Sequence, residues 1–385
     1  MGGSSHSHPL NLLILDGDGV SDELTNATEK VLKELSTSLG IHFILERKAV
    51  GLKALKQSGT TFPADVLDAA RKADGIILGP VSHNEYPPVA EGGVNPSGEL
   101  RRLLDLYANV RPARSLSGIS PRFGKPIDLV IVRENTEGFY ADRSMFMGPG
   151  EFMPTPDVAL ALRKVTRTGS TRIAECGFSI ARRRRKKVTV VHKANVLRVS
   201  DGLFLKCVRE VAEQYSDIEY EEKLIDSMAA LLVRDPTPFD VVLTTNMFGD
   251  ILSDQAVEIS GSIGLGGSLN FGSGHALAQA QHGSAPDLAD LDTVNPYSLI
   301  SSTAMLLEWI GRRRSDDLLL RTASTLGRVL ESTIANPEWR TVDLGGPLGT
   351  SAFASRVALN VRHALQADAT PPVQDGIDLR SREGL

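Results

Sequence analysis

The stretch Val241-Val-Leu-Thr-Thr-Asn-Met-Phe-Gly-Asp-Ile-Leu-Ser-Asp254 changes its pattern in the middle. Residues 241–245 form a short apolar run rich in β-branched side chains, which is typical of a buried strand. Between residues 248 and 260, apolar residues recur at helical spacing. A buried strand followed directly by an amphipathic helix is the repeating unit of α/β proteins, so we expect an α/β fold.

The same alternation extends on both sides of this stretch. Further buried strands are predicted by the apolar runs at 10–15, 41–45, 75–79, 129–132 and 188–191. Helical spacing is found at 21–39, 63–72, 99–107 and 197–214, and after Pro296 the chain is mostly helical to about residue 365. Strands that are apolar throughout need helices on both faces of their sheet.

The overall composition is that of an ordinary globular protein. The chain has 385 residues, of which 41% are hydrophobic and 23% charged, and its length allows two or three domains. A formal net charge of -5 provides no general attraction for nucleic acid or for an anionic membrane. No apolar run approaches ~20 residues and we see no signal peptide, so we expect a cytoplasmic protein. Cys176 and Cys207 fit a reducing compartment and are better explained as buried thiols than as part of a zinc site.

Several segments carry loop signals or an unusual charge pattern. Pro, Gly and polar residues predict long loops at 81–98, 148–156 and 261–274, and we expect residues 1–9 and the tail from 367 to be loose. The basic run 182–187 has the composition of a nucleic-acid-binding patch. Because it directly precedes the strand at 188–191, a solvated helix C-terminus is the better interpretation, and RNA binding remains a weaker alternative.

Asp250 and Asp254 are four residues apart, so a helix places both carboxylates on one face. A divalent cation would neutralise the pair, whereas capping of a helix N-terminus would explain one of the two better than both. Asp226 opens the helical segment 227–233 and is either a helix cap or a third carboxylate ligand. Carboxylate ligands suit Mg²⁺ or Mn²⁺ better than zinc.

Three arginines lie at the end of apolar stretches or just after them: Arg101, Arg111 and Arg133. If they converge, they can form bidentate pairs with a polycarboxylate; singly, each is better explained as a surface ion-pair residue. Tyr140 follows a turn that contains glycine, where its hydroxyl can donate a proton, although a half-buried aromatic ring is the commoner role.

The segment His192-Lys-Ala-Asn195 follows an apolar strand, and the carboxyl ends of strands are where open α/β sheets bind ligands. Lys193 is a candidate general base and Asn195 a candidate orienting group; the alternative is a loop lysine followed by a turn asparagine. For His192 we expect a structural hydrogen bond.

The glycine-rich stretch 261–274 leads to His282-Gly-Ser-Ala-Pro-Asp287 and then to Asn295. Glycine-rich backbone beside an acid can hold a nucleotide and bind a ribose hydroxyl. Gly17 and Gly19 lack the third glycine of the dinucleotide-binding fingerprint, so they indicate only a tight turn.

Taken together, these motifs make the chain resemble the isocitrate and isopropylmalate dehydrogenase family, the metal-dependent β-decarboxylating dehydrogenases, from about residue 10 to about 365. The blocks that carry the resemblance are Leu106-Tyr-Ala-Asn-Val-Arg-Pro112, Val132-Arg-Glu-Asn-Thr-Glu-Gly138, His192-Lys-Ala-Asn-Val196, Asn246-Met-Phe-Gly-Asp-Ile-Leu-Ser-Asp254 and His282-Gly-Ser-Ala-Pro-Asp287. The resemblance implies a two-domain α/β fold with a large mixed sheet that spans both domains and is flanked by helices. The large cofactor-binding domain would be 1–107 plus 262–385, and the smaller domain 108–261 would carry the metal site and the dimer interface.

The resemblance also implies a reaction, the oxidative decarboxylation of a 2-hydroxy-3-carboxy acid with hydride transfer to NAD. Arg101, Arg111 and Arg133 then match the arginines that bind substrate carboxylates, and Tyr140 matches the acid that protonates the enolate. Lys193 and Asp226 match residues that the partner subunit of a homodimer supplies, and Asn195 is expected among the substrate-binding residues. Asp250 and Asp254 match the remaining ligands of Mg²⁺ or Mn²⁺.

On the cofactor side, the resemblance implies a binding segment made of His282, Gly283, Ser284, Ala285, Asp287 and Asn295. NAD-using members carry an acid at the position of Asp287, where a carboxylate binds the ribose hydroxyls and repels a 2′-phosphate. Two departures affect this side: 16–23 reads Asp-Gly-Asp-Gly-Val-Ser-Asp-Glu, and Gln279 stands where a glutamate is usual.

The substrate's side chain is the least determined feature. Members acting on isocitrate place a serine and, two residues later, an asparagine upstream of the first arginine; here Asn95 and Ser97 occupy these positions in reverse order. An isocitrate-like substrate is therefore favoured over isopropylmalate or homoisocitrate. A non-catalytic regulatory subunit is the alternative of another class, and the presence of Tyr140, Lys193 and all three aspartates argues against it.

Overall fold

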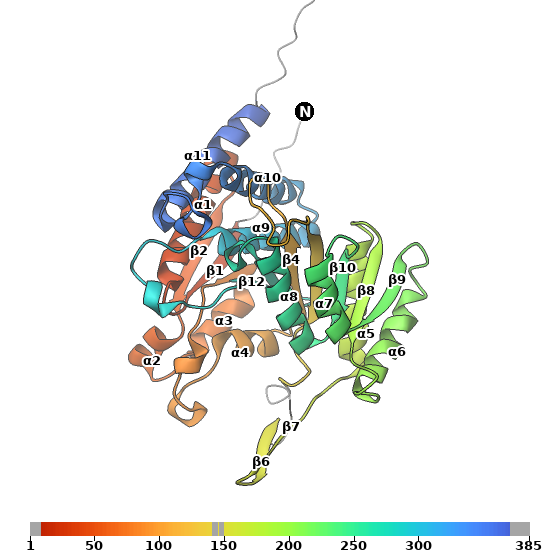
Figure 1. Ribbon diagram of the computed structural model, residues 1–385. Coiled ribbons are helices and arrows are strands. Elements are labelled where there is room, and N and C mark those ends of the chain that lie inside the picture. Colours follow the sequence, from red (N-terminus) through yellow and green to blue (C-terminus); the bar gives the residue numbers. More distant parts are fainter. Residues whose placement is uncertain (1–8, 141–144, 146–149, 370–385) are drawn as a thin grey trace, which may run out of the picture.

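The α/β fold predicted from the sequence is confirmed by the computed structural model, which describes residues 9–140, 145 and 150–369. A ten-stranded mixed sheet forms the body, helices cover both of its faces, and a separate two-stranded hairpin projects away from it (Figure 1). The strand order is β2-β1-β3-β12-β11-β4-β5-β10-β8-β9.

The sheet consists of β1 (Leu10–Asp16), β2 (Phe43–Ala49), β3 (Gly75–Leu78), β4 (Ala108–Arg114), β5 (Asp128–Glu134), β8 (Lys187–His192), β9 (Glu219–Leu224), β10 (Val241–Thr244), β11 (Gly267–Phe271) and β12 (Ala276–Ala280). The hairpin is β6 (Glu151–Thr155) and β7 (Val158–Ala161). The helices are α1 (Ser21–Leu39), α2 (Leu52–Ser58), α3 (Ala64–Lys72), α4 (Pro96–Leu103), α5 (Arg167–Ala181), α6 (Ser200–Ala212), α7 (Ile225–Arg234), α8 (Asn246–Ser260), α9 (Tyr297–Arg314), α10 (Asp317–Ala335) and α11 (Thr350–Ala369).

All six predicted strands are present, but the loop prediction for 261–274 is wrong because it contains β11. Glycines and serines fit there because β11 lies between β12 and β4 under α9, where Gly267 faces Met305 and Ser301. The loop predicted at 148–156 includes β6, and the tail expected from 367 is helical through Ala369.

The predicted helix at 99–107 is also misplaced. Helix α4 begins earlier, at Pro96, and the Asn95 side chain caps it by accepting a hydrogen bond of 3.1 Å from the Gly98 amide. It ends at Leu103, and the chain then enters β4, which carries Arg111. Asp226 is likewise no cap: Leu224 is the N-cap of α7, and Asp226 lies in its first turn.

The sheet is built from two contiguous sets of five strands. Strands β2, β1, β3, β12 and β11 come from the ranges 9–107 and 262–369, whereas β4, β5, β10, β8 and β9 come from 108–261. The two halves meet where β11 pairs with β4 in antiparallel register, Leu269 opposite Val110. This junction is the middle of the sheet, and the strands that carry candidate site residues lie beside it.

Each half has an apolar core on both sheet faces, as alternation along the strands requires. In β1, Leu12 and Ile14 pack with α1, α9, α10 and α11, while Leu13 and Leu15 pack with α3 and α4. In the other half, α5 and α6 cover one face and α7 and α8 the other.

The basic run behaves as a helix end. Helix α5 stops at Ala181, and Arg184 pairs with Asp128 and Asp240, both at 2.7 Å.

His192 has the structural hydrogen bond expected of it, accepting from the Ala194 amide at 3.0 Å. Both cysteines are free thiols, and burial raises the pKa of Cys176 to about 12.

Candidate functional site

Two arginines from adjacent strands meet two aspartates from one helix. Arg111 on β4 donates to Asp250 Oδ1 and Asp254 Oδ1, each at 3.2 Å, through the same Nη1. Arg133 on β5 also donates to Asp250 Oδ1. The Tyr140 hydroxyl donates to the other oxygen of that carboxylate, at 3.3 Å. Three side chains, each more than 100 positions from Asp250 in the sequence, therefore share its carboxylate.

The local structure of α8 explains this convergence. The helix begins at Asn246, so Asp250 and Asp254 lie in its interior on one face, and capping does not account for them. Asn246 accepts from Arg133 Nε at 2.9 Å and from Nη2 at 2.6 Å. A Cβ at Gly249 would lie 2.6 Å from Arg133 Cγ, so the arginine passes α8 only because residue 249 lacks a side chain.

The charges in this cluster are unevenly buried. The side chains of Arg111 and Arg133 are 8% and 2% exposed, whereas those of Asp250 and Asp254 are 37% and 49% exposed. Burial, together with repulsion from Arg133, lowers the pKa of Arg111 to about 10. Burial opposes ionisation of Asp250, but Arg133 and Arg111 outweigh it and lower the pKa of that carboxyl. Two buried guanidiniums beside exposed carboxylate oxygens form a site that can accept both an anion and a cation.

These groups line a cavity of about 260 Å³ between α4, α8 and the end of β12. The predicted residues that line it are Asn95, Ser97, Arg101, Arg111, Arg133, Tyr140, Asp250, His282 and Gly283. Asp254 adjoins them through its bond to Arg111.

Two glutamines missing from the sequence-based site also line the cavity. Gln279 Oε1 accepts from Ser97 Oγ at 2.9 Å and from Arg101 Nη2 at 3.4 Å, while Gln281 Nε2 donates to Asp254 Oδ1 at 2.9 Å. Their spacing of two on β12 and just beyond it places both on one side of the strand. The sequence had pointed to Gln279 only as a departure from the usual glutamate, and the spacing of the two glutamines gains meaning once β12 is known to be a strand.

Lys193, Asn195 and Asp226 do not line this cavity. Lys193 Nζ pairs with Asp226, whose side chain is 62% exposed, and Asn195 is exposed in the turn that follows. The turn is anchored by buried Asp201, which accepts from the Lys193 amide at 2.6 Å. Within the described part of one chain, no three His, Cys, Asp or Glu side chains are grouped so that they could hold a metal ion.

Exposed apolar side chains occur in the turn after Lys193, on α8 and on the β6–β7 hairpin. Val196 and Val199 in the same turn are 66% and 88% exposed, and Ile251, beside Asp250 on α8, is 56% exposed. The β6–β7 hairpin, which projects from the sheet (Figure 1), carries Met153 and Leu160. Their exposed fractions are 61% and 47%. Such side chains are typical of a surface that another protein covers.

The predicted cofactor segment is partly open. His282 Nε2 is buried without a hydrogen-bond partner, while Nδ1 lies 3.0 Å from the Gly283 carbonyl oxygen. A Cβ on Gly283 would meet no atom within 4 Å, and Asp287 is exposed. Ser284 is buried, Ala285 is left-handed with φ 38°, and the amide oxygen of Asn295 accepts from the Tyr297 amide at the start of α9.

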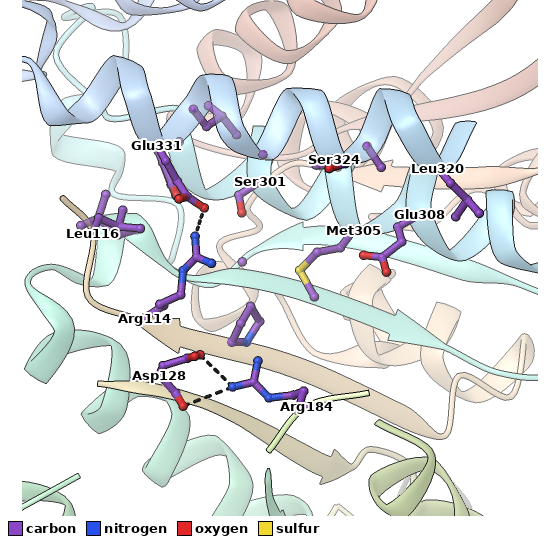
Figure 2. A pocket seen from close by; sticks show the side chains of 18 of the residues that line it. Arg114, Leu116, Asp128, Arg184, Ser301, Met305, Glu308, Leu320, Ser324 and Glu331 are labelled. Atoms are coloured by element: carbon purple, nitrogen blue, oxygen red, sulfur yellow. Dashed lines mark hydrogen bonds and ion pairs between the residues drawn. The ribbon is translucent and has the colours of Figure 1, made fainter. Parts of the chain in front are cut away.

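A larger cavity, of about 520 Å³, lies between α9, α10 and the opposite side of β4 (Figure 2). Arg114 is three residues from Arg111, so it points to the other sheet face. It pairs with Glu331 on α10, and Arg184 pairs with Asp128. None of the predicted site residues lines this cavity, so its size does not make it the candidate site.

In the described ranges, no helix is both long and apolar enough to cross a membrane.

Comparison with known proteins gives one consistent family. The family model described as isocitrate/isopropylmalate dehydrogenase matches residues 11–357. The chain is 37% identical to homoisocitrate dehydrogenase of Methanocaldococcus jannaschii, covering 93% of this chain and 99% of that one. It is 36% identical to 3-isopropylmalate dehydrogenase of Sulfurisphaera tokodaii, over 89% and 97% of the two chains.

A solved structure agrees with these sequence matches. The crystal structure of isocitrate dehydrogenase from Methylococcus capsulatus superposes with a TM-score of 0.82 at 38% identity, covering 92% of this chain and 99% of that one. Three substrates thus appear among similar relatives, while the reaction class is common to them. The chain is an oxidoreductase of the decarboxylating dehydrogenase class and belongs to the isocitrate/isopropylmalate dehydrogenase family.

Proposed function

We propose that this chain catalyses the NAD-dependent and Mg²⁺- or Mn²⁺-dependent oxidative decarboxylation of a 2-hydroxy-3-carboxy acid to a 2-oxo acid and CO₂. The observation that carries the proposal is the pair of buried guanidiniums, Arg111 and Arg133, which share the Asp250 carboxylate beside a cavity. Two guanidiniums held this way can bind the substrate's carboxylates, and the exposed oxygens of Asp250 and Asp254 can bind a metal ion.

The chain's own donor set fits such a metal in part. Asp250 and Asp254 offer hard oxygen ligands on one helix face, and the exposed Asp226 of the partner subunit would complete the set. When bound, Mg²⁺ or Mn²⁺ supplies Lewis-acid chemistry that polarises the substrate's oxygen atoms.

Substrate binding and proton transfer are assigned to different side chains. Arg101, Arg111 and Arg133 bind and orient the substrate's carboxylates. The partner subunit's Lys193 would take the proton of the 2-hydroxyl, and Tyr140, held by Asp250, would return a proton to the carbon that has lost CO₂. NAD, when bound, would supply the hydride acceptor for the oxidation.

Sharing of residues between subunits makes a homodimer part of the proposal. It is supported by the location of Lys193 and Asp226 outside the cavity. The exposed apolar side chains Val196 and Val199 in the turn after Lys193, and Ile251 beside Asp250, also support it. We also propose that the two sets of five strands correspond to two domains, 1–107 plus 262–385 and 108–261.

NAD is favoured over NADP on the cofactor side. The exposed Asp287 would bind ribose hydroxyls and repel a 2′-phosphate, and the unpartnered Nε2 of His282 offers a hydrogen bond to a nucleotide. The open space above Gly283 leaves room for the cofactor to approach the backbone.

Asp287→Lys should therefore shift the ratio of kcat/KM for NAD and NADP towards NADP. An unchanged ratio would mean that Asp287 does not face the ribose.

Among substrates, an isocitrate-like acid is favoured because Ser97 and Arg101 present polar groups to the cavity. The alternatives, isopropylmalate and homoisocitrate, gain support from a neighbouring hollow of about 410 Å³ that shares His83, Asn95 and Gly98 with the cavity. Val89 and Val94 line that hollow, so an apolar or longer side chain would also find contacts there.

The test is NADH formation at 340 nm with Mn²⁺ and a panel of substituted malates: isocitrate, homoisocitrate, 3-isopropylmalate and 3-methylmalate. We expect turnover of at least one, abolished by a chelator and restored by Mn²⁺. No turnover by the pure protein, with activity appearing only when a second subunit is added, would instead support a regulatory subunit.

A further inference from the structure

Residues 79–95, the loop between β3 and α4, precede Arg101 and are here called the substrate loop. A buried hydrogen bond joins this loop to the cofactor segment. Ser82 Oγ and Ser284 Oγ lie 2.7 Å apart, and the two residues are 6% and 7% exposed. Their neighbours Val81, His83 and Gly283 line the candidate cavity. A single contact therefore connects the segments that face the two proposed ligands.

Asp18 anchors the same loop from a third segment, the turn after β1. Its carboxylate accepts hydrogen bonds from the Ser82 amide at 2.9 Å, the Tyr86 hydroxyl at 2.5 Å and the Leu52 amide at 2.7 Å. Asp18 is 6% exposed, so these donors replace the water that an ionised carboxylate would otherwise bind. Burial, followed by the bond to Asp18, raises the pKa of Tyr86 well above its ordinary value, so its hydroxyl remains a donor.

The turn that carries Asp18 is also fixed to the cofactor segment. The Val20 amide donates to the Ser284 carbonyl at 2.9 Å. A Cβ on Gly19 would lie 2.0 Å from that carbonyl oxygen, so the two backbones approach as closely as glycine permits. Ser284 is thus held through its side chain by the substrate loop and through its backbone by the turn.

We propose that Asp18, Ser82, Tyr86 and Ser284 couple binding of the dinucleotide to binding of the hydroxy acid, as positioning residues that fix the substrate loop when the cofactor segment is occupied. The inference rests on the function proposed above. When one ligand orders its segment, ordering the other segment costs less conformational entropy. Each ligand therefore increases the affinity of the protein for the other ligand, and by the same factor.

The test measures that factor directly. The dissociation constant of NADH is determined by its fluorescence with Mg²⁺, in the absence and in the presence of the substituted malate that the wild-type protein turns over. NADH and a hydroxy acid cannot react with each other, so the ternary complex persists. We expect NADH to bind about fivefold or more tightly when the acid is present.

Tyr86→Phe removes the hydroxyl that donates to Asp18, and Ser82→Ala removes the contact with Ser284; each should bring the ratio of the two constants towards one. A purely structural weakening would raise both constants in the same proportion and leave the ratio unchanged. Tyr215→Phe and Ser260→Ala are matched controls. The Tyr215 ring packs on Phe178, and the Ser260 hydroxyl donates to the Val257 carbonyl at 2.7 Å.

Thermal unfolding of each variant verifies that it is folded; both avoid replacing the buried Asp18 itself. A ratio of one in the wild-type protein, or a wild-type ratio in both variants, would overturn the coupling while leaving the proposed function intact. Absence of NADH binding or of turnover on the whole panel would overturn the proposed function and the coupling with it.

Discussion

Arginines line a cavity on each side of the sheet near β4. Arg111 and Arg133 line the candidate site, here called the front, and Arg114 and Arg184 line the opposite cavity, here called the rear. The two sets differ in burial and in partners. On the front, Arg111 and Arg133 are 8% and 2% exposed and share the carboxylate of Asp250. On the rear, Arg114 is 46% exposed and pairs with Glu331, while Arg184 is 24% exposed and pairs with Asp128 and with the buried Asp240. Figure 2 shows the pairs with Glu331 and Asp128. The two rear arginines are paired with three acids, whereas the two front arginines hold buried positive charge against the partly exposed carboxylates of Asp250 and Asp254. Burial of both guanidiniums, rather than the number of arginines or the cavity volume, distinguishes the front set.

The largest effect should follow loss of the shared acid. Asp250→Asn leaves Arg111 and Arg133 close together without the carboxylate between them and removes a candidate metal ligand. Metal-dependent turnover should fall by more than about 100-fold, beyond the range for groups that only support a ligand. Steady-state kinetics across a Mn²⁺ titration measure this, with near-UV circular dichroism to check the fold.

Glu331→Gln on the rear side is the matched control, since it also removes the acid partner of an arginine, Arg114. It should leave turnover unchanged. If Asp250→Asn and Glu331→Gln reduced activity equally, the distinction between the two sides would be wrong.

A conservative change of Arg133 should have the next largest effect. Lysine keeps the charge but cannot contact Asn246 and Asp250 through three separate nitrogens as Arg133 does. Losing a charge-assisted hydrogen bond costs about 1.5–3 kcal/mol, so kcat/KM of Arg133→Lys should fall by about 10- to 150-fold. Arg114→Lys on the rear should match the wild type, and an equal loss in both variants would contradict the assignment.

A smaller, pH-dependent effect is expected at His282. Burial lowers its pKa from the ordinary value of 6.5, so below pH 6.5 the unfolded chain binds a proton more readily than the folded chain does. Stability due to this group is complete above pH 6.5 and is lost as the pH falls below it. His282→Gln should make the melting temperature decline less steeply between pH 7 and 5, and the exposed His42→Gln should not. Parallel curves for wild type and His282→Gln would exclude this contribution.

The smallest effect concerns the rear ion pair. Arg114 and Glu331 are each about half exposed, and such surface pairs contribute at most about 1 kcal/mol. Arg114→Ala should change the free energy of unfolding in urea by no more than this amount, at unchanged kcat. A loss of several kcal/mol would show that the rear pair holds the two halves together.

The sequence predicted the elements that follow apolar periodicity and missed those that do not. The strand Val241–Thr244 was predicted because it is a continuous apolar run, and the helix Ser21–Leu39 because its apolar residues recur at helical spacing. Strand β9, with Glu219, Glu221 and Glu222, lies at the sheet edge and needs no apolar run, and β11 is rich in small and polar residues because α9 packs closely on it.

For the site, residue types and family motifs identified Arg111, Arg133 and Asp250, but their meeting at one carboxylate depends on strands placed together by the fold. Gln281 was missed because its role exists only through contact with Asp254. The assignment of Asp226 stays a prediction, since it depends on a second chain.

The order of strands also has a consequence for synthesis on the ribosome. Strand β3 pairs with β12, with Ile76 beside Leu277. About 200 further residues must therefore be synthesised before the edge of the N-terminal half at β3 can be paired. The half formed by 108–261 is continuous and can complete its own five strands as soon as it emerges. We therefore expect the middle of the chain to fold first during translation, with β3 left as an open edge that nascent-chain chaperones would have to shield.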